Sequence, residues 1–316
     1  MKLLSYSVRE TPGIGVLLGD WVLDLNKAFA DHLGDAYEDL PGPFDLDMLS
    51  FLDLGAEGLA EARRALDEAG NRMESGEASG MEGMLYPLKE VKLMAPIPYP
   101  RKNIVCLGLN YADHVREGRK TLQQERPLPK HPIYFTKSPT TVTGPYDDII
   151  YPRATERLDY EVELALVIGK RGKYIPEDEV LDHIMGYTAF NDISARDLQS
   201  QHGQWYKGKS CDTFAPMGPY LVTSDEVGDP QSLDLWLKVN GETRQSSNTA
   251  NMIFDLKKIV SILSEGITLE VGDIIATGTP SGVGSAHPLG LLKVGDFVEI
   301  WIDKIGTIGN KVVAES

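Results

Sequence analysis

Three carboxylates are the residues of this chain best suited to chemistry. Glu161 and Glu163 lie two residues apart in Asp159-Tyr-Glu-Val-Glu-Leu, which continues as an apolar, β-branched run typical of a buried strand. Because side chains alternate along a strand, both acids are expected to project from one side. Asp192 ends a second expected strand, just before a helix. An all-oxygen set suits Mg²⁺, Mn²⁺ or Ca²⁺ better than zinc.

A plainer interpretation of the same three acids stays open from the sequence. Glu161 and Glu163 could form the solvated edge of a strand, and Asp192 could cap the following helix. Two neighbouring carboxylates beside an apolar run repel each other and resist burial unless a cation or a proton neutralises them. The pattern therefore predicts either a cation site or an exposed strand edge.

A second pair of residues could move protons. His114 and Glu117 are three apart in a segment expected to be helical, so they face the same way. A carboxylate beside an imidazole orients it and raises its basicity, which suits activation of water. The alternative is a surface helix on which the two residues are in register without a function.

Two lysines and a glycine-rich loop are weaker candidates for binding an anion. Lys209 stands among small residues, where it is either a fixed cation for a carboxylate or enolate, or a solvated loop charge. Lys137 ends an expected strand and could meet an anionic group. The segment 278–284 holds three glycines, which favour a backbone nest for anions but lack the ending of a Walker loop.

The elements that must position these residues divide the chain into two expected parts. Residues 1–93 read as strands and a hairpin at Gly19-Asp20, followed by a helix-forming segment around residues 57–69. We expect a small N-terminal α/β accessory domain there. Prolines between residues 86 and 101 mark the boundary, and residues 94–316 form the expected catalytic domain. Residues 118–131, which are polar and aperiodic, are a candidate lid.

Composition excludes several classes of protein. The 316 residues are 42% hydrophobic and 25% charged, as in ordinary globular proteins, and their net charge of −16 argues against nucleic acid as a partner. The chain offers neither a signal peptide at its start nor an apolar run long enough for a membrane span, so a cytoplasmic protein is expected. Cys106 and Cys211 are expected to be free thiols.

Five motifs in one order resemble the fumarylacetoacetate hydrolase family, over about residues 94–313. They are G-L-N-Y-A-D-H-x-x-E, D-Y-E-x-E-L-A-x-V-I-G-K, N-D-x-x-A-R-D-x-Q, G-K-S-x-D-x-x-x-P-x-G-P and T-G-T-P-S-G-V-G. The branch they resemble most contains acylpyruvate hydrolases and oxaloacetate decarboxylases. The resemblance implies a β-rich mixed α+β fold with a β-roll catalytic domain, and a homodimer.

The resemblance also implies roles for individual residues. Glu161, Glu163 and Asp192 match the ligands of Mg²⁺ or Mn²⁺, with Ca²⁺ also acceptable. His114, Glu117 and Lys209 match the catalytic set, in which the first two activate water and the lysine stabilises an enolate. Arg196, Gln199 and Thr279 match residues that bind substrate.

The activity expected first is hydrolysis of a carbon–carbon bond in a 2,4-dioxo acid, with release of pyruvate or a related keto acid. The alternatives are oxaloacetate decarboxylation or keto–enol tautomerisation at the same metal site, and a metal-stabilised binding protein in which His114 and Glu117 are idle. Relatives that act on small dioxo acids often carry Lys or Arg where this chain has Leu109, which argues against a small dicarboxylate such as oxaloacetate.

Overall fold

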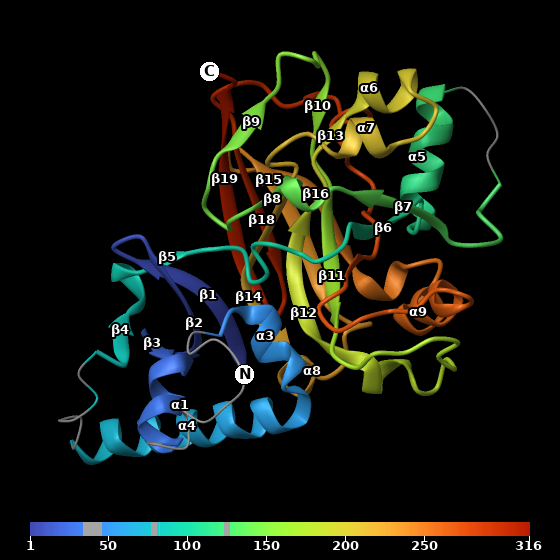
Figure 1. The fold of residues 1–316 in the computed structure, drawn as a ribbon. Coiled ribbons are helices and arrows are strands. Elements are labelled where there is room, and N and C mark those ends of the chain that lie inside the picture. The colour runs from blue at the N-terminus through green and yellow to red at the C-terminus, as the bar shows by residue number, and fades with distance from the viewer. Residues whose placement is uncertain (34–45, 77–80, 82, 123–126) are drawn as a thin grey trace.

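The computed structural model describes residues 1–33, 46–76, 81, 83–122 and 127–316, with the backbone alone for residues 118–122. The protein is a mixed α+β structure rich in strands, as the sequence predicted (Figure 1). Its β-rich part carries the expected catalytic residues, and the N-terminal strands and helices lie at one end of it (Figure 1).

The N-terminal part is built from short strands and amphipathic helices. Its strands are β1 (Lys2–Val8), β2 (Thr11–Leu18), β3 (Trp21–Asp24), β4 (Leu85–Pro87) and β5 (Lys92–Leu93). Its helices are α1 (Leu25–Leu33), α3 (Met48–Asp53) and α4 (Gly55–Ser75). Residues Gly19 and Asp20 connect β2 and β3, which pair from Leu18 opposite Trp21, so the predicted hairpin is confirmed. The helix predicted over 57–69 lies within α4.

The remaining elements form the larger part. Its strands are β6 (Ile104–Gly108), β7 (Ile133–Lys137), β8 (Val142–Thr143), β9 (Ile149–Tyr151), β10 (Leu158–Asp159), β11 (Val162–Ile168), β12 (Ile184–Asn191), β13 (Ser194–Ala195), β14 (Ala215–Thr223), β15 (Asp234–Val239), β16 (Glu242–Asn248), β17 (Ile274–Ala276), β18 (Phe297–Ile302) and β19 (Gly306–Ala314). Its helices are α5 (Ala112–Leu122), α6 (Arg196–Gln201), α7 (Tyr206–Lys209), α8 (Ser224–Val227) and α9 (Leu256–Ser264).

The described strands form two main sheets and one small one. The largest runs in the order β4-β3-β2-β1-β14-β12-β11-β17-β6-β7, with β5 paired to β1 and β8 to β14. A second sheet has the order β16-β15-β18-β19-β9, and β10 pairs with β13. Because β1 pairs antiparallel with β14, the N-terminal strands extend the sheet that carries the predicted metal ligands. The domain boundary after residue 93 stays a prediction.

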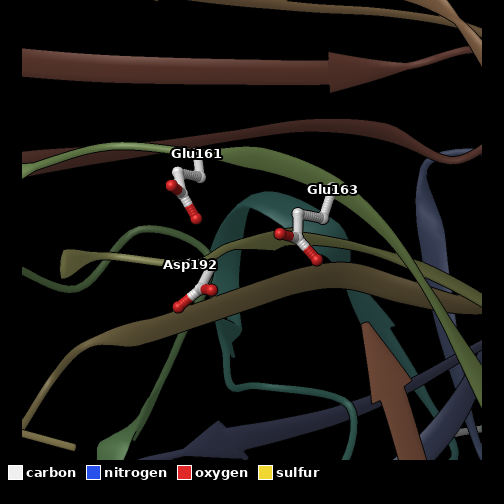
Figure 2. Close-up of side chains that lie close together, drawn as sticks. All are labelled: Glu161, Glu163 and Asp192. Carbon is white, nitrogen blue, oxygen red and sulfur yellow. The ribbon is translucent and has the colours of Figure 1, made fainter. Parts of the chain in front are cut away.

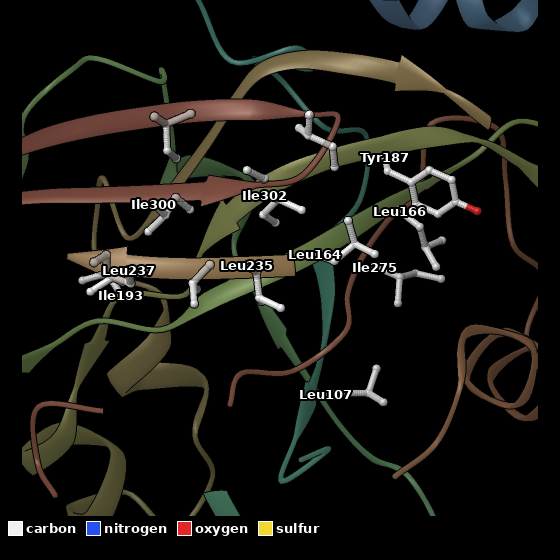
Figure 3. Packing of buried hydrophobic residues seen from close by; sticks show 14 of the residues in the cluster. Leu107, Leu164, Leu166, Tyr187, Ile193, Leu235, Leu237, Ile275, Ile300 and Ile302 are labelled. Atoms are coloured by element: carbon white, nitrogen blue, oxygen red, sulfur yellow. The ribbon is translucent and has the colours of Figure 1, made fainter. Parts of the chain in front are cut away.

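Strand β11 separates two hydrophobic cores. Leu164 and Leu166 point into the core between the two main sheets, which also contains Leu235 of β15 and Ile300 of β18 (Figure 3). The side chains on the other face of β11, which include Ala165, belong to a second core shared with the N-terminal helices. Burying a leucine or isoleucine side chain fully stabilises the fold by about 1.5–3 kcal/mol. The cores therefore hold β11 rigidly, and Glu163 with it.

The structure changes one expected connection. Residues 118–122, predicted to begin a polar loop, instead complete helix α5, which fits the helix-forming residues Arg119, Lys120 and Leu122. Residues 123–126 of the candidate lid lie outside the described residues. In the described part of the chain, no helix has the length and apolarity needed to cross a membrane. Both cysteines are free thiols, as expected.

Candidate active site

Glu161, Glu163 and Asp192 converge at one buried point. A carboxylate oxygen of each lies within 4.8 Å of one from each of the others, and all three residues are at most 5% exposed. Figure 2 shows the two glutamates extending from one chain segment toward Asp192 on the neighbouring one. Val162 pairs with Asn191, which brings the beginning of β11 beside the end of β12. The solvated strand edge is therefore excluded.

The donor set fits a hard divalent cation. All three ligand atoms are carboxylate oxygens, and His and Cys are absent from this described cluster. Burial and the negative charges of Asp192 and Glu161 raise the pKa of Glu163 well above its usual value. Its only described partner is the backbone N–H of Gly278, which donates a 2.8 Å hydrogen bond. Glu163 is thus the carboxylate that most requires a metal ion or a proton.

Three basic side chains compensate the other carboxylates. Lys209 donates to Glu161 at 2.7 Å and to Asp192 at 2.6 Å. Arg196 donates to Glu161 at 2.5 Å and to Asp159 at 2.7 Å. Burial favours protonation of Glu161, but the charges of Arg196, Lys209 and His114 outweigh it and hold the pKa of Glu161 well below its usual value.

Lys209 is positioned by close packing of two short helices. A side chain on Gly208 would put its Cβ 2.5 Å from the backbone nitrogen of Gln199, so only glycine lets α7 approach α6 this closely. Burial alone would lower the pKa of Lys209, but Asp192 and Glu161 raise it above its usual value. Lys209 is therefore a permanent cation of the site and not a proton acceptor. The solvated loop charge is excluded, since this side chain is 2% exposed.

Lys137 is the residue whose importance sequence reasoning underestimated. Its side chain is fully buried, and its ammonium donates to Asp192 at 2.5 Å and to the carbonyl of Ile193 at 3.0 Å. Asp192 thereby lies between two lysines. The expectation that Lys137 meets an anionic group is confirmed, but the anion belongs to the protein. The signal in the sequence was a lysine that ends an otherwise apolar strand.

The glycine-rich loop binds carboxylates of this chain. The N–H of Gly278 donates to Glu163, and that of Gly282 donates to both oxygens of Glu117 at 3.0 Å. Asp159 accepts from Gly284 at 2.6 Å and from Ser285 at 3.0 Å. The prediction of an anion-binding nest is confirmed. Asp159, for which no role was predicted, is the buried acid that links this loop to Arg196.

His114 and Glu117 face each other on α5, as their spacing predicted. Nδ1 of His114 lies 3.5 Å from a carboxylate oxygen of Glu117, and both side chains are partly buried. Since Glu117 is held by Gly282, it can orient the imidazole, which leaves Nε2 as the ring nitrogen for proton exchange. Both side chains line the same cavity as Glu161 and Glu163.

A cavity of about 480 Å³ joins these groups. Of the predicted site residues, Asp192 is fully buried, does not line the cavity and accepts a hydrogen bond from Lys209, which does. The other predicted site residues all line it: His114, Glu117, Glu161, Glu163, Arg196, Gln199, Lys209 and Thr279. Gln199 accepts a 3.1 Å hydrogen bond from Arg196, and the hydroxyl of Thr279 accepts one from Gln245 at 2.8 Å. Part of the wall is apolar, and Leu109 belongs to it with a left-handed backbone at φ 58°.

The sequence of this chain is similar to those of known enzymes. The family described as fumarylacetoacetate (FAA) hydrolase C-terminal matches residues 103–313. The chain is 44% identical to oxaloacetate tautomerase YisK of Bacillus subtilis (strain 168), over 99% of this chain and 100% of that protein. It is 45% identical to mitochondrial oxaloacetate tautomerase FAHD2A of Bos taurus, over 99% of this chain and 92% of that protein.

Solved structures show the same fold. Fumarylacetoacetate hydrolase from psychrophilic Exiguobacterium antarcticum superposes with a TM-score of 0.78 at 34% identity, covering 100% of both chains. Maleylpyruvate hydrolase from Sphingobium sp. SYK-6 superposes with a TM-score of 0.73 at 30% identity, again covering 100% of both chains. The similar proteins thus include both tautomerases and hydrolases.

Proposed function

We propose, from the premise that this chain belongs to the fumarylacetoacetate hydrolase family, that it is a divalent-metal-dependent keto–enol tautomerase of oxaloacetate. The observation that carries the proposal is the buried set of three carboxylates at a cavity that also holds Lys209 and His114. Relatives named oxaloacetate tautomerase, at 44% and 45% identity over nearly the whole chain, support this activity over the hydrolysis expected first from the sequence.

Glu161, Glu163 and Asp192 would hold Mg²⁺ or Mn²⁺. When bound, such an ion supplies a Lewis acid that polarises a keto group and favours its enolate. Lys209 adds a fixed positive charge beside the same carboxylates, where it stabilises the negative charge that develops on the substrate oxygen. Both effects lower the cost of removing a proton from the carbon next to the keto group.

His114 is the group that moves the proton. Glu117 orients its ring through Nδ1, and Nε2 accepts the proton from C3 of the substrate and returns one to the oxygen. Lys209 does not compete for this role, because its pKa is raised and it stays protonated. Arg196 and Gln199 fix the carboxylates and the cavity wall around the substrate.

Hydrolysis of a 2,4-dioxo acid remains the second candidate. It is favoured by the His114–Glu117 pair, which could activate water, and by the similarity to a solved maleylpyruvate hydrolase. The two reactions need the same metal ligands and the same lysine, so they differ in whether water attacks the substrate.

One set of assays separates the candidates. Purified protein with Mg²⁺ is given the enol form of oxaloacetate, and the loss of enol absorbance, the release of CO₂ and the formation of pyruvate are followed together. Acetylpyruvate is tested in parallel for cleavage to pyruvate and acetate. We expect faster loss of enol without CO₂, abolished by EDTA and by Lys209→Met. Cleavage of acetylpyruvate without accelerated tautomerisation would replace the proposal by the hydrolase.

The homodimer and the cytoplasmic location stay predictions. We expect sedimentation analysis of the purified protein to give twice the monomer mass.

A further inference from the structure

Arg157 is a basic residue that lines the cavity and has no role in the proposed mechanism. It lies in the segment between β9 and β10, and its side chain is exposed and lines the same cavity as Glu161 and Lys209. Within the described part of the chain its guanidinium has no ion pair or hydrogen bond to a protein group. Its position in the cavity wall therefore leaves five N–H donors available to a ligand.

The backbone of Arg157 is anchored although its side chain is not. Its N–H donates to the hydroxyl of Thr155 at 3.1 Å, and its carbonyl accepts from the N–H of Arg196 at 2.9 Å. The next two residues form β10, which pairs with β13 ahead of α6. Arg157, Asp159 and Glu161 are spaced two residues apart in this extended segment. Because side chains alternate along an extended chain, all three project from the same side. The guanidinium is thus attached to a fixed part of the cavity rim.

The other basic groups of the cavity are already committed. Arg196 contacts Asp159 and Glu161, and Lys209 contacts Glu161 and Asp192. His114 faces Glu117, and Leu109 contributes an apolar wall. A substrate with one carboxylate and a keto group can be compensated by these groups and the metal ion. A second carboxylate on the same substrate requires a further cation, because the net charge of −16 opposes the approach of a dianion.

We infer that Arg157 binds the distal carboxylate of a dicarboxylic 2-oxo acid and thereby makes the cavity selective for dicarboxylates over monocarboxylates of the same length. A guanidinium can hold a carboxylate through two parallel hydrogen bonds, which gives both charge and orientation. This inference rests on the proposed function in naming a 2-oxo acid as the substrate. It is tested by binding, independently of turnover.

The test compares two non-reacting ligands that differ only at the distal group. Malate carries a carboxylate where 2-hydroxybutanoate carries a methyl group, and both have the same 2-hydroxy acid end. Affinities are measured by titration calorimetry in the presence of saturating Mg²⁺. The variants are Arg157→Gln and Arg157→Lys, with Arg116→Gln as the matched control. Arg116 is an exposed arginine of α5 that does not line the cavity, and its replacement changes the net charge equally.

We expect wild-type protein to prefer malate, and Arg157→Gln to weaken malate binding by about 10-fold or more, as for loss of a charge-assisted hydrogen bond. Binding of 2-hydroxybutanoate should change by less than about 2-fold. Arg157→Lys should recover part of the malate affinity, and Arg116→Gln should match wild type. Equal weakening of both ligands, no weakening of malate, or no preference for malate in wild type would each overturn the inference.

Failure of the proposed function gives a different pattern. If oxaloacetate is not tautomerised but Arg157→Gln still weakens malate selectively, the tautomerase is wrong and the dicarboxylate site stands. If tautomerisation is observed and Arg157→Gln binds malate like wild type, the tautomerase stands and the role of Arg157 is wrong.

Discussion

Replacement of Lys137 by methionine tests how the buried charges of the site are balanced. The change keeps the length of the side chain but removes the ammonium that donates to Asp192 and to the carbonyl of Ile193. Both Lys137 and Asp192 are 0% exposed, so water cannot replace the lost partner. Removing one member of a buried ion pair costs about 3–5 kcal/mol.

The expected change in melting temperature follows from the size of the protein. An unfolding entropy of about 2.1 cal/mol/K per residue gives about 0.66 kcal/mol/K for 316 residues. A loss of 3–5 kcal/mol then lowers the melting temperature by about 5–8 °C. Because Asp192 retains only Lys209 in the variant, saturating Mg²⁺ should recover part of this loss and should raise the melting temperature more than in wild type.

Lys102→Met is the matched control. Lys102 also donates to one carboxylate, that of Asp273 at 2.6 Å, and to one backbone carbonyl, that of Thr268 at 3.5 Å, but its side chain is 45% exposed. Solvent-exposed pairs contribute about 1 kcal/mol or less, so we expect a shift below about 2 °C that does not depend on Mg²⁺. Equal shifts in Lys137→Met and Lys102→Met, measured by scanning calorimetry, would refute the argument from burial.

Three further predictions concern the same site. His114→Ala should lower kcat for tautomerisation by about 100-fold or more and leave Mg²⁺ affinity near that of wild type. Steady-state kinetics and metal titration measure the two quantities, and a kcat equal to that of wild type would show that another group moves the proton. The pKa of Glu163 is raised, so the metal-free protein should lose stability as pH rises above the usual carboxyl range. The gain in melting temperature on adding Mg²⁺ should grow over the same rise in pH, and a gain independent of pH would contradict this. Gly278→Ala should weaken Mg²⁺ binding in a metal titration. Its φ is +96° and the new Cβ would lie 2.7 Å from the Cβ of Asn110, so the backbone N–H that donates to Glu163 would be displaced. Unchanged affinity would show that this hydrogen bond is dispensable.

The predicted metal ligands were accessible from the sequence because their geometry is local. Glu161 and Glu163 share a face through strand alternation, and Asp192 follows the neighbouring strand, so pairing of the two strands brings the acids together. His114 and Glu117 are likewise related by one helical turn. Lys209 needed the family motif, because its position depends on the packing of Gly208 against α6.

Other features depended on contacts that the sequence does not contain. Lys137 is 55 residues from Asp192, so a lysine at the end of an apolar strand indicated an anionic partner but could not identify it as Asp192. The loop glycines indicated an anion but not that it would be Glu163, Glu117 or Asp159. Arg157 acquires a role only through the cavity that it lines. The polar loop predicted from residue 118 was wrong over residues 118–122, where local helix propensity continues α5.

The type of reaction was the least accessible property. Hydrolysis, decarboxylation and tautomerisation all require a metal ion that polarises a keto group and a cation that stabilises an enolate, so one set of motifs serves all three. Leu109 suggested that a small dicarboxylate is not the substrate, but the relatives named oxaloacetate tautomerase oppose that expectation. The described cavity offers Arg157 as an alternative source of positive charge.

The most direct test of the tautomerase is exchange of the C3 protons of oxaloacetate with solvent. Keto oxaloacetate is incubated in D₂O with protein and Mg²⁺, and the loss of the C3 proton signal is followed by NMR against samples with EDTA and with His114→Ala. Enolisation at the metal site predicts deuterium incorporation well above the uncatalysed rate, without formation of pyruvate, and its loss in both controls. Exchange at the uncatalysed rate, or exchange that persists in EDTA, would contradict the proposed function.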